Sequence, residues 1–199
     1  MKNVHGRLAS AMGFSLIDII ASVAVIGTVS AIAVPQVNTA LDSMRLGMSL
    51  RDVERELQFA KLKAVSTNRP MRIRFDCPSA GQIRVVEVIG TSAAPDANDA
   101  DAVTNRCSET TYPYRPTGAD ASRLTRPNND GAVRIMYEGT TFTAKQTLEF
   151  WPDGTAHTAC QAACDTSATK IGTVTLTLSR KSKTKNITVN GLGKILQDR

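Results

Sequence analysis

The stretch GFSLIDIIASVAVIGTVSAIAV, residues 13–34, decides how the rest of this 199-residue chain is interpreted. Phe14 to Val34 are 21 residues, and Asp18 is the one charged residue among them. At a rise of 1.5 Å per residue, a helix of this length can span a bilayer. A charge at the centre of a membrane helix costs about 2.5–3.5 kcal/mol, so the presence of Asp18 needs an explanation.

Three interpretations of this segment are open. The first is a plain membrane anchor. The second is a secretory signal peptide, because Ala31-Ile32-Ala33 is a small-x-small cleavage site that would release a soluble β-domain beginning at Val34. The third takes in the residues before the apolar run, where Met1 to Gly13 form a short segment whose charges, Lys2 and Arg7, are basic.

The third interpretation rests on a resemblance to a known family. Gly13-Phe14-Ser15-Leu16-Ile17 resembles the class III leader of type IV pilins and type II secretion pseudopilins. The resemblance implies that prepilin peptidase removes residues 1–13 by cutting after Gly13, and that the new N-terminal Phe14 is methylated. Pro35 matches a proline in the anchor helices of many pilins, where it kinks the helix. Asp18 departs from the pattern, since the family usually has glutamate there.

A charge pair would explain the acid. While the leader is attached, Lys2 and Arg7 would keep it on the cytoplasmic side, which places the globular part in the periplasm and a single helix in the bacterial inner membrane. After cleavage, the amine of Phe14 would lie at the head of a helix packed among neighbouring helices. Asp18, one turn later, would neutralise that amine within the subunit or from the next one, because an unpaired charge is costly in such surroundings.

A second helical segment follows the apolar run. Its apolar side chains repeat at spacings of three and four residues, which predicts one buried stripe on an amphipathic helix over residues 35–67: Leu46, Leu50, Val53, Leu57, Ala60 and Ala64. Asn68-Arg69-Pro70 should end this helix, because the residue before a proline is disfavoured in the α region. Residues 14–34 and 35–67 would then form one long helix.

Residues 68–199 are predicted to form an antiparallel β-sheet domain, so that the fold class is α+β and pilin-like, with the long helix packed on the sheet. Alternating or β-branched runs predict strands at 71–77, 83–89, 132–137, 147–151, 173–179 and 186–189. Pro78-Ser79-Ala80-Gly81 predicts a hairpin turn, and residues 90–131 form a long loop.

Two later segments extend the resemblance. Thr147 to Thr155 (TLEFWPDGT) is similar to the aromatic-x-Pro-x-Gly segment of GspH/FimT-type minor pilins, and Lys185 to Gly191 resembles the terminal strand of that family. The resemblance implies a non-catalytic structural subunit of a type IV pilus or a type II secretion pseudopilus. Its partners would be prepilin peptidase, the inner membrane before assembly, and other pilins or pseudopilins.

Four cysteines are an even number in a chain with an export-like N-terminus, which favours two disulfides. Three pairings are possible. We expect Cys77–Cys107 and Cys160–Cys164, because each closes one irregular segment. The alternative is a metal site, since His157, Cys160 and Cys164 superficially resemble a zinc cluster, but a fourth ligand is not evident.

No catalytic residues, metal or cofactor are expected. His5 lies in the leader, which leaves His157, interpreted as an exposed loop residue, as the one histidine of the mature chain. Gly191-Leu192-Gly193-Lys194 lacks the spacing of a phosphate-binding loop. The series Asp96, Asp99 and Asp101 lacks the glycine and the distal glutamate of a calcium loop.

The C-terminal hairpin, residues 173–199, is the basic part of the chain. Residues 180–199 carry six basic side chains and one acidic side chain, a formal charge of +5. Some FimT-type minor pilins use a Gly-Arg-x-Arg motif on this element in DNA uptake, and residues 191–194 are its counterpart with Leu and Lys in place of the arginines. The alternative function is therefore DNA binding through five basic residues: Arg180, Lys181, Lys183, Lys185 and Lys194.

Overall fold

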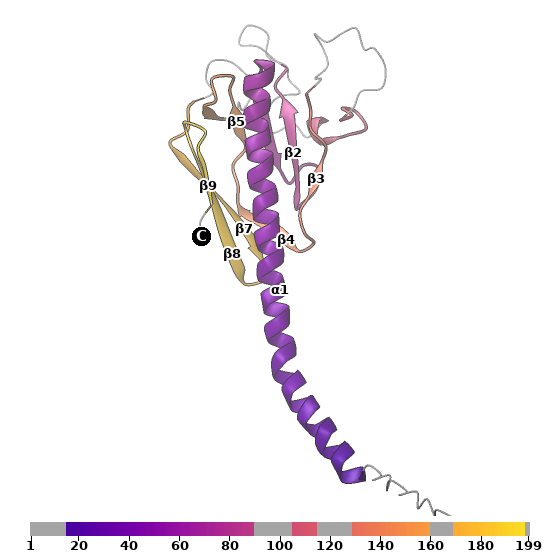
Figure 1. The fold of residues 1–199 in the computed structure, drawn as a ribbon. Coiled ribbons are helices and arrows are strands. Elements are labelled where there is room, and N and C mark those ends of the chain that lie inside the picture. Colours follow the sequence, from indigo (N-terminus) through magenta and orange to yellow (C-terminus); the bar gives the residue numbers. More distant parts are fainter. Residues whose placement is uncertain (1–14, 90–104, 115–128, 160–168, 198–199) are drawn as a thin grey trace, which may run out of the picture. The chain divides into compact units, whose positions relative to one another are not determined.

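The computed structural model describes residues 15–89, 105–114, 129–159 and 169–197. The chain divides into two compact units, Met1–Leu41 and Asp42–Arg199. Helix α1 (Leu16–Thr67) begins in the first unit and ends in the second. All the strands belong to the second unit, which we call the globular unit (Figure 1).

In the first unit, α1 is an apolar helix with exposed side chains. Leu16, Ile17 and Ile26, among others, are more than half exposed. The helix is long and apolar enough to cross a membrane, judged by length and composition. Pro35 lies inside it, and the hydroxyl of Thr39 donates to the Pro35 carbonyl at 2.9 Å. α1 continues through Pro35, although the proline has no N–H to donate to the preceding turn.

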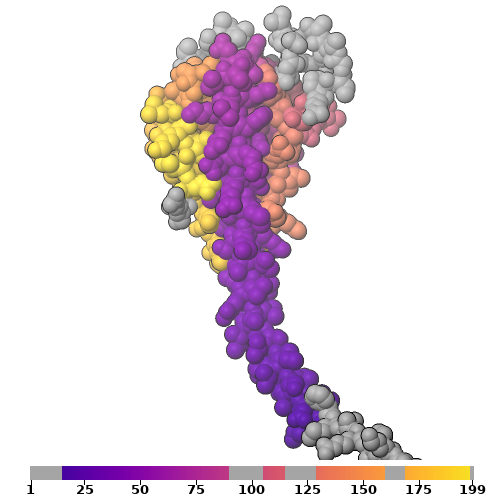
Figure 2. All heavy atoms as spheres, in the orientation of Figure 1, coloured from indigo at the N-terminus to yellow at the C-terminus, as the bar shows by residue number. Residues whose placement is uncertain are grey.

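In the globular unit, α1 buries the stripe that its spacing predicted. Leu46, Leu50, Val53, Leu57, Ala60 and Ala64 are each at most 2% exposed, which confirms the prediction. The opposite face of the helix is uncovered (Figure 2). The helix ends at Thr67, as predicted. Asn68 adopts a left-handed conformation (φ 54°), and the N–H of Arg69 donates to the Ala64 carbonyl, a common way to close a helix C-terminus.

The larger sheet has five antiparallel strands in the order β3-β2-β1-β5-β6. They are β1 (Met71–Phe75), β2 (Gln82–Glu87), β3 (Arg134–Ile135), β5 (Leu148–Phe150) and β6 (Ala156–Thr158). The β1–β2 hairpin turns through Pro78 to Gly81, as predicted, and Gly81 has the positive φ (75°) that favours glycine. A 3-10 helix, η2 (Asn105–Cys107), lies between β2 and β3 in the sequence.

The smaller sheet has four antiparallel strands in the order β4-β7-β8-β9. They are β4 (Thr140–Ala144), β7 (Thr173–Arg180), β8 (Lys183–Asn190) and β9 (Ile195–Gln197). The predicted basic hairpin is the pair β7–β8, in register from Thr173 opposite Asn190 to Arg180 opposite Lys183. The division of the strands between two sheets was not indicated by the sequence.

One hydrophobic core joins the helix and both sheets. Alternate residues of the strands face the helical stripe, as the twofold period of a strand requires. Besides that stripe, the core includes Met71, Ile73, Ile83, Val85, Leu148 and Phe150 of the larger sheet and Leu176, Leu178, Ile187 and Val189 of the smaller one. The two sheets are thus held together through side chains that meet at α1.

The strand predictions were correct for the strongly apolar runs and missed the short strands. β1, β2, β5, β7 and β8 coincide with predicted runs to within a few residues. The predicted strand at 132–137 is reduced to Arg134–Ile135. Strands β4, β6 and β9 were not predicted, because runs of only three to five residues carry little periodic signal.

We expect truncation of the helical stripe to destabilise the globular unit. Leu57→Ala removes a side chain that is 0% exposed, which should lower the free energy of unfolding by about 2–5 kcal/mol. The matched control is Leu62→Ala on the outer face, where the side chain is 69% exposed and the change should be within about 0.5 kcal/mol. Urea unfolding of the full chain in detergent micelles measures both. Equal losses in the two variants would contradict this packing.

Candidate functional site

Asp18 lies in the first turn of α1 among exposed apolar side chains. Its backbone N–H donates to the Ser15 carbonyl at 3.0 Å, and the hydroxyl of Ser22 donates to the Asp18 carbonyl at 2.6 Å. Among the described residues, no basic side chain forms an ion pair with this carboxylate. Gly13 and Phe14, the predicted processing and methylation residues, lie outside the described part of the chain.

A second acid of the same helix, Asp42, is paired within the globular unit. Its two carboxylate oxygens accept hydrogen bonds from Arg180 Nε at 3.0 Å and from Lys181 Nζ at 2.6 Å. Arg180 also donates to the Glu138 carbonyl. The hydrogen bond from Lys181, aided by Arg180, holds the pKa of the Asp42 carboxyl below its ordinary value, against the effect of desolvation. The turn of the β7–β8 hairpin is thereby attached to α1.

The structure divides the five predicted DNA-binding residues into separate groups. Arg180 is 8% exposed and belongs to the Asp42 ion pair, so the expectation that it lies on an accessible basic surface needs correction. Lys181 is exposed, and Lys183 and Lys185 are half-buried on β8. Lys194 lies beyond the other end of β8, which is eight residues long, so roughly 20 Å or more of strand separates it from the hairpin turn.

The turn around Lys194 is built for packing. The carboxamide oxygen of Asn190 accepts the N–H groups of Leu192 and Lys194 at 3.1 and 2.9 Å. Lys61 of α1 donates to the carbonyl of Gly193 at 3.0 Å, and Gly193 has a positive φ of 67°. The Gly-Leu-Gly-Lys segment is therefore a tight turn hydrogen-bonded to the helix, as the sequence interpretation of a turn suggested.

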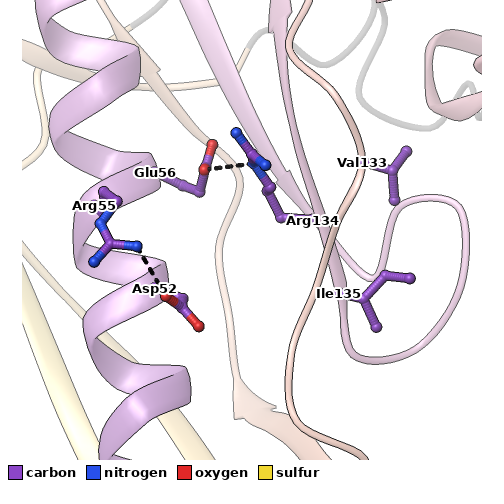
Figure 3. Close-up of a pocket in the computed structure, with 6 residues that line it drawn as sticks. All are labelled: Asp52, Arg55, Glu56, Val133, Arg134 and Ile135. Carbon is purple, nitrogen blue, oxygen red and sulfur yellow. Dashed lines mark hydrogen bonds and ion pairs between the residues drawn. The ribbon is translucent and has the colours of Figure 1, made fainter.

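A shallow hollow lies between α1 and the edge strand β3 (Figure 3). Its volume is about 370 Å³, and it is lined by Asp52, Arg55, Glu56, Val133, Arg134 and Ile135. Glu56 accepts from Arg134 Nε at 3.0 Å, and Arg55 pairs with Asp52 at 3.3 Å. Burial raises the pKa of the Glu56 carboxyl despite Arg134. The charges of this hollow satisfy one another, and it contains no nucleophile–base pair.

A disulfide between Cys77 and Cys107 attaches η2 to the end of β1, as predicted from the cysteine count. The other predicted pair, Cys160 and Cys164, lies outside the described residues, as do Asp96, Asp99 and Asp101. Within the described ranges, no group of His, Cys, Asp and Glu side chains is arranged to hold a metal ion.

Buried arginines fix the segment after η2 against β2. Arg84, which is 0% exposed, donates to the carbonyls of Gly131, Arg106 and Tyr112. Arg106 donates to a carboxylate oxygen of Asp130 at 2.5 Å. Burial raises the pKa of Asp130 although both arginines oppose that shift. No local pattern in the sequence indicated this network, because its members are distant in the chain and lie next to a segment without periodicity.

His157 is not an exposed loop residue, which corrects the interpretation from sequence. It lies in β6, half-buried, with its ring stacked on that of Trp151 at 4.5 Å between centroids. Its Nε2 lies 2.7 Å from the hydroxyl of Thr155. The aromatic-Pro-Asp-Gly turn therefore packs on the next strand through this histidine.

A long N-terminal helix, apolar in its first part and packed on antiparallel sheets in its second, defines a pilin-like subunit. The family model described as Type II transport protein GspH matches residues 49–193, and the chain belongs to this family of minor pilins and pseudopilins. It is a subunit of the type IV pilus or type II secretion class, whose members are structural and act with other pilins in a filament.

Solved structures give a more distant similarity. Two crystal structures of the type IV minor pilin FimU from Pseudomonas aeruginosa resemble the chain. One is 12% identical, covers 79% of this chain and 90% of its own, and has a TM-score of 0.46. The other is 14% identical, covers 77% and 93%, and has a TM-score of 0.43. No curated protein sequence gives a significant match.

The Asp42 ion pair should make stability depend on pH. Because the pKa is lowered in the folded state, the pair contributes fully above the unfolded value of about 3.9, and its contribution is lost as the pH falls through the native value. Asp42→Asn should therefore be less stable than the parent at neutral pH, and the difference should shrink in acid. Urea unfolding over this pH range measures it. Asp52→Asn, which removes an acid of the same helix whose pair with Arg55 is partly exposed and screened by solvent, is the control. A pH-independent loss in Asp42→Asn would contradict the assignment.

Removal of the disulfide should destabilise the globular unit. Cys77 and Cys107 are 30 residues apart, and closing a loop of that length stabilises the folded state by about 3–4 kcal/mol in the chain-entropy model. The variant Cys77→Ala/Cys107→Ala should lose an amount of this order in urea unfolding under oxidising conditions. Reduction of the parent protein should give a similar loss. A parent whose stability is unaffected by reductant would contradict this role.

Proposed function

We propose that this subunit is cut after Gly13 by prepilin peptidase, methylated on Phe14, and assembled into its filament through the N-terminal part of α1. The observation that carries the proposal is the single carboxylate of Asp18 in the first turn of an apolar helix with exposed side chains. Family membership supplies the class of assembly, and the sequence GFSLID supplies the expected cleavage position.

Charge pairing gives Asp18 its role in assembly. A helix in an apolar environment gains from contact with other apolar helices, but that contact does not fix their register. A carboxylate that must find the cation of a processed N-terminus fixes the register, because either charge left alone is strongly unfavourable away from water. Aspartate carries the same charge as the usual glutamate and is one methylene shorter.

The orientation in the membrane follows from the leader. Lys2 and Arg7 precede the apolar helix, and positive charges favour the cytoplasmic side. The globular unit would then lie in the periplasm, where an oxidising environment is consistent with the Cys77–Cys107 disulfide. The two other interpretations of the N-terminus, a plain anchor and a signal peptide cut after Ala33, give different mature ends.

The first test is the mature N-terminus. In a bacterium that contains prepilin peptidase, mass spectrometry of the purified protein should find methylated Phe14 as the first residue. Gly13→Ala should keep the leader attached, because the resemblance implies that the peptidase recognises the glycine before the cut. Gly6→Ala, within the same leader, is the matched control and should be processed. A chain that begins at Val34, or normal shortening of Gly13→Ala, would overturn this part.

The second test is incorporation into the filament. Asp18→Ala should reduce the amount of subunit in sheared filaments more than tenfold, because loss of one partner of a desolvated pair costs about 3–5 kcal/mol. Asp18→Glu should retain incorporation. Asp52→Ala, an acid of the same helix in the globular unit, should have little effect. Quantitative immunoblots of the filament and membrane fractions give the result, and normal incorporation of Asp18→Ala would reject the charge pair.

DNA binding by the hairpin stays a prediction of the sequence. Arg180 is held in an ion pair, and Lys194 lies beyond the far end of β8. Fewer than the five predicted basic residues can therefore contact one stretch of DNA phosphates. Such binding would be weak and steeply salt-dependent, since each phosphate contact contributes about one unit to the salt slope. Duplex DNA is therefore a suitable competitor in experiments on ligand binding by the hairpin.

A further inference from the structure

Basic side chains of α1 and of the β7–β8 hairpin lie where the globular unit begins. We call the set of Arg45, Lys181 and Lys185 the basal cationic surface; Arg180, which is 8% exposed and paired with Asp42, lies beside it. Arg45 lies on the helix and is exposed, and Lys181 lies at the hairpin turn with 69% of its side chain exposed. Lys185 is directed toward the helix from β8, since its Nζ lies 4.0 Å from where a Cβ on Gly47 would be.

This surface lies close to the apolar unit in the sequence. Asp42, which is bound by Arg180 and Lys181, comes directly after Leu41, the last residue of that unit. Asp42 comes eight positions after Val34, where the predicted membrane segment ends. The headgroup layer on each side of a bilayer is about 5–7 Å thick, and electrostatic attraction extends a further 8–10 Å at physiological salt.

A hollow of about 460 Å³ opens beside this surface, lined by Arg45, Tyr137, Glu138, Gly139 and Arg180. The ion pair with Asp42 and the bond to the Glu138 carbonyl fix the guanidinium of Arg180 in its wall. Arg45 makes no ion pair among the described residues, and Tyr137 is 43% exposed. A fixed cation, a second arginine and a phenol suit a phosphate group.

We propose that the basal cationic surface binds the phosphate headgroups of anionic phospholipids while the subunit is still held in the membrane. The three basic side chains of this surface, together with Arg180, exceed the two nearby acids, Asp42 and Glu138, which leaves a formal charge of +2. Bound headgroups would hold the globular unit against the bilayer until the subunit enters a filament. The proposal rests on membrane anchoring by residues 14–34.

A lipid suits the surface better than DNA does. A duplex presents a long row of phosphates, whereas this surface is confined to one end of the unit and Lys194 lies beyond the far end of β8. Membrane attachment also raises the local concentration of headgroups greatly, so that a modest intrinsic affinity suffices. Juxtamembrane basic residues gain about 1 kcal/mol each from an anionic surface.

The test is native mass spectrometry of the full-length chain in neutral detergent, titrated with phosphatidylglycerol or phosphatidylcholine. The parent should retain phosphatidylglycerol preferentially. Arg45→Gln/Lys185→Gln should weaken that binding about 30-fold. The loss of two contributions of about 1 kcal/mol each removes about 2 kcal/mol of binding free energy, and about 1.4 kcal/mol corresponds to a tenfold change in affinity. Lys63→Gln/Lys194→Gln, which removes the same charge elsewhere, should bind like the parent. Neither pair of substitutions breaks an ion pair among the described residues.

Further variants and competing ligands distinguish lipid binding from misfolding and from binding of free phosphate esters or DNA. Arg45→Lys/Lys185→Arg should restore binding, and equal thermal unfolding of the variants shows that they are folded. Equal retention of the two lipids, or no loss in Arg45→Gln/Lys185→Gln, overturns the proposal. Displacement of the lipid by millimolar glycerol 3-phosphate assigns the site to free phosphate esters instead, and duplex DNA that outcompetes the lipid assigns it to DNA. The intact mass in the same spectra reports the N-terminus, so a failure of lipid binding is distinguished from a failure of processing.

Discussion

Burial of one face of the second part of α1 is the interaction on which the globular unit depends. The two sheets share no strand, and the backbone link between them at Ala156 and Gly191 lies at one end of β8. Leu50, Val53 and Leu57 are almost fully buried in a core that includes residues of both sheets. Without that helical face, each sheet would expose an apolar surface to water, which neither could cover alone. The helix is thus part of the core, and it also continues into the apolar unit that marks the chain as a pilin.

Two acids of the same helix illustrate how environment sets a role. Asp42 is bound by Arg180 and Lys181, so its charge is satisfied within the chain and fixes the β7–β8 hairpin. Asp18 lies among exposed apolar side chains, without an ion pair in the described part of the protein. A carboxylate paired within the chain, as Asp42 is, stabilises the folded globular unit. A carboxylate without an internal ion pair, such as Asp18, would be stabilised in apolar surroundings by a cation from another chain or from a newly formed N-terminus.

The predictions from sequence succeeded where a local pattern carried the information. The stripe from Leu46 to Ala64 and the strands around Ile73 and Val85 were found by their periods of 3.6 and 2. Arg84 and Arg106 could not be placed in the same way, because a buried arginine is recognised only by the carbonyls and carboxylates that surround it. The same reason applies to Arg180, which by sequence alone is one of several basic residues in a basic hairpin and in the structure is a buried partner of Asp42.

By itself, the sequence determined the long helix, its division into an apolar and an amphipathic part, the main strands, and the likeness to pilins. The helix and the strands depend on residues that are close in the chain, and hydrophobic periodicity reports them directly. The likeness to pilins rests on short motifs such as Gly13-Phe14-Ser15-Leu16-Ile17. Only the tertiary structure decided that the strands form two sheets, which lysines share a surface, and which acid each arginine binds. Those choices depend on contacts between residues that are far apart in the chain, such as Asp42 and Arg180 at a separation of 138 positions, and no local pattern encodes such a pairing.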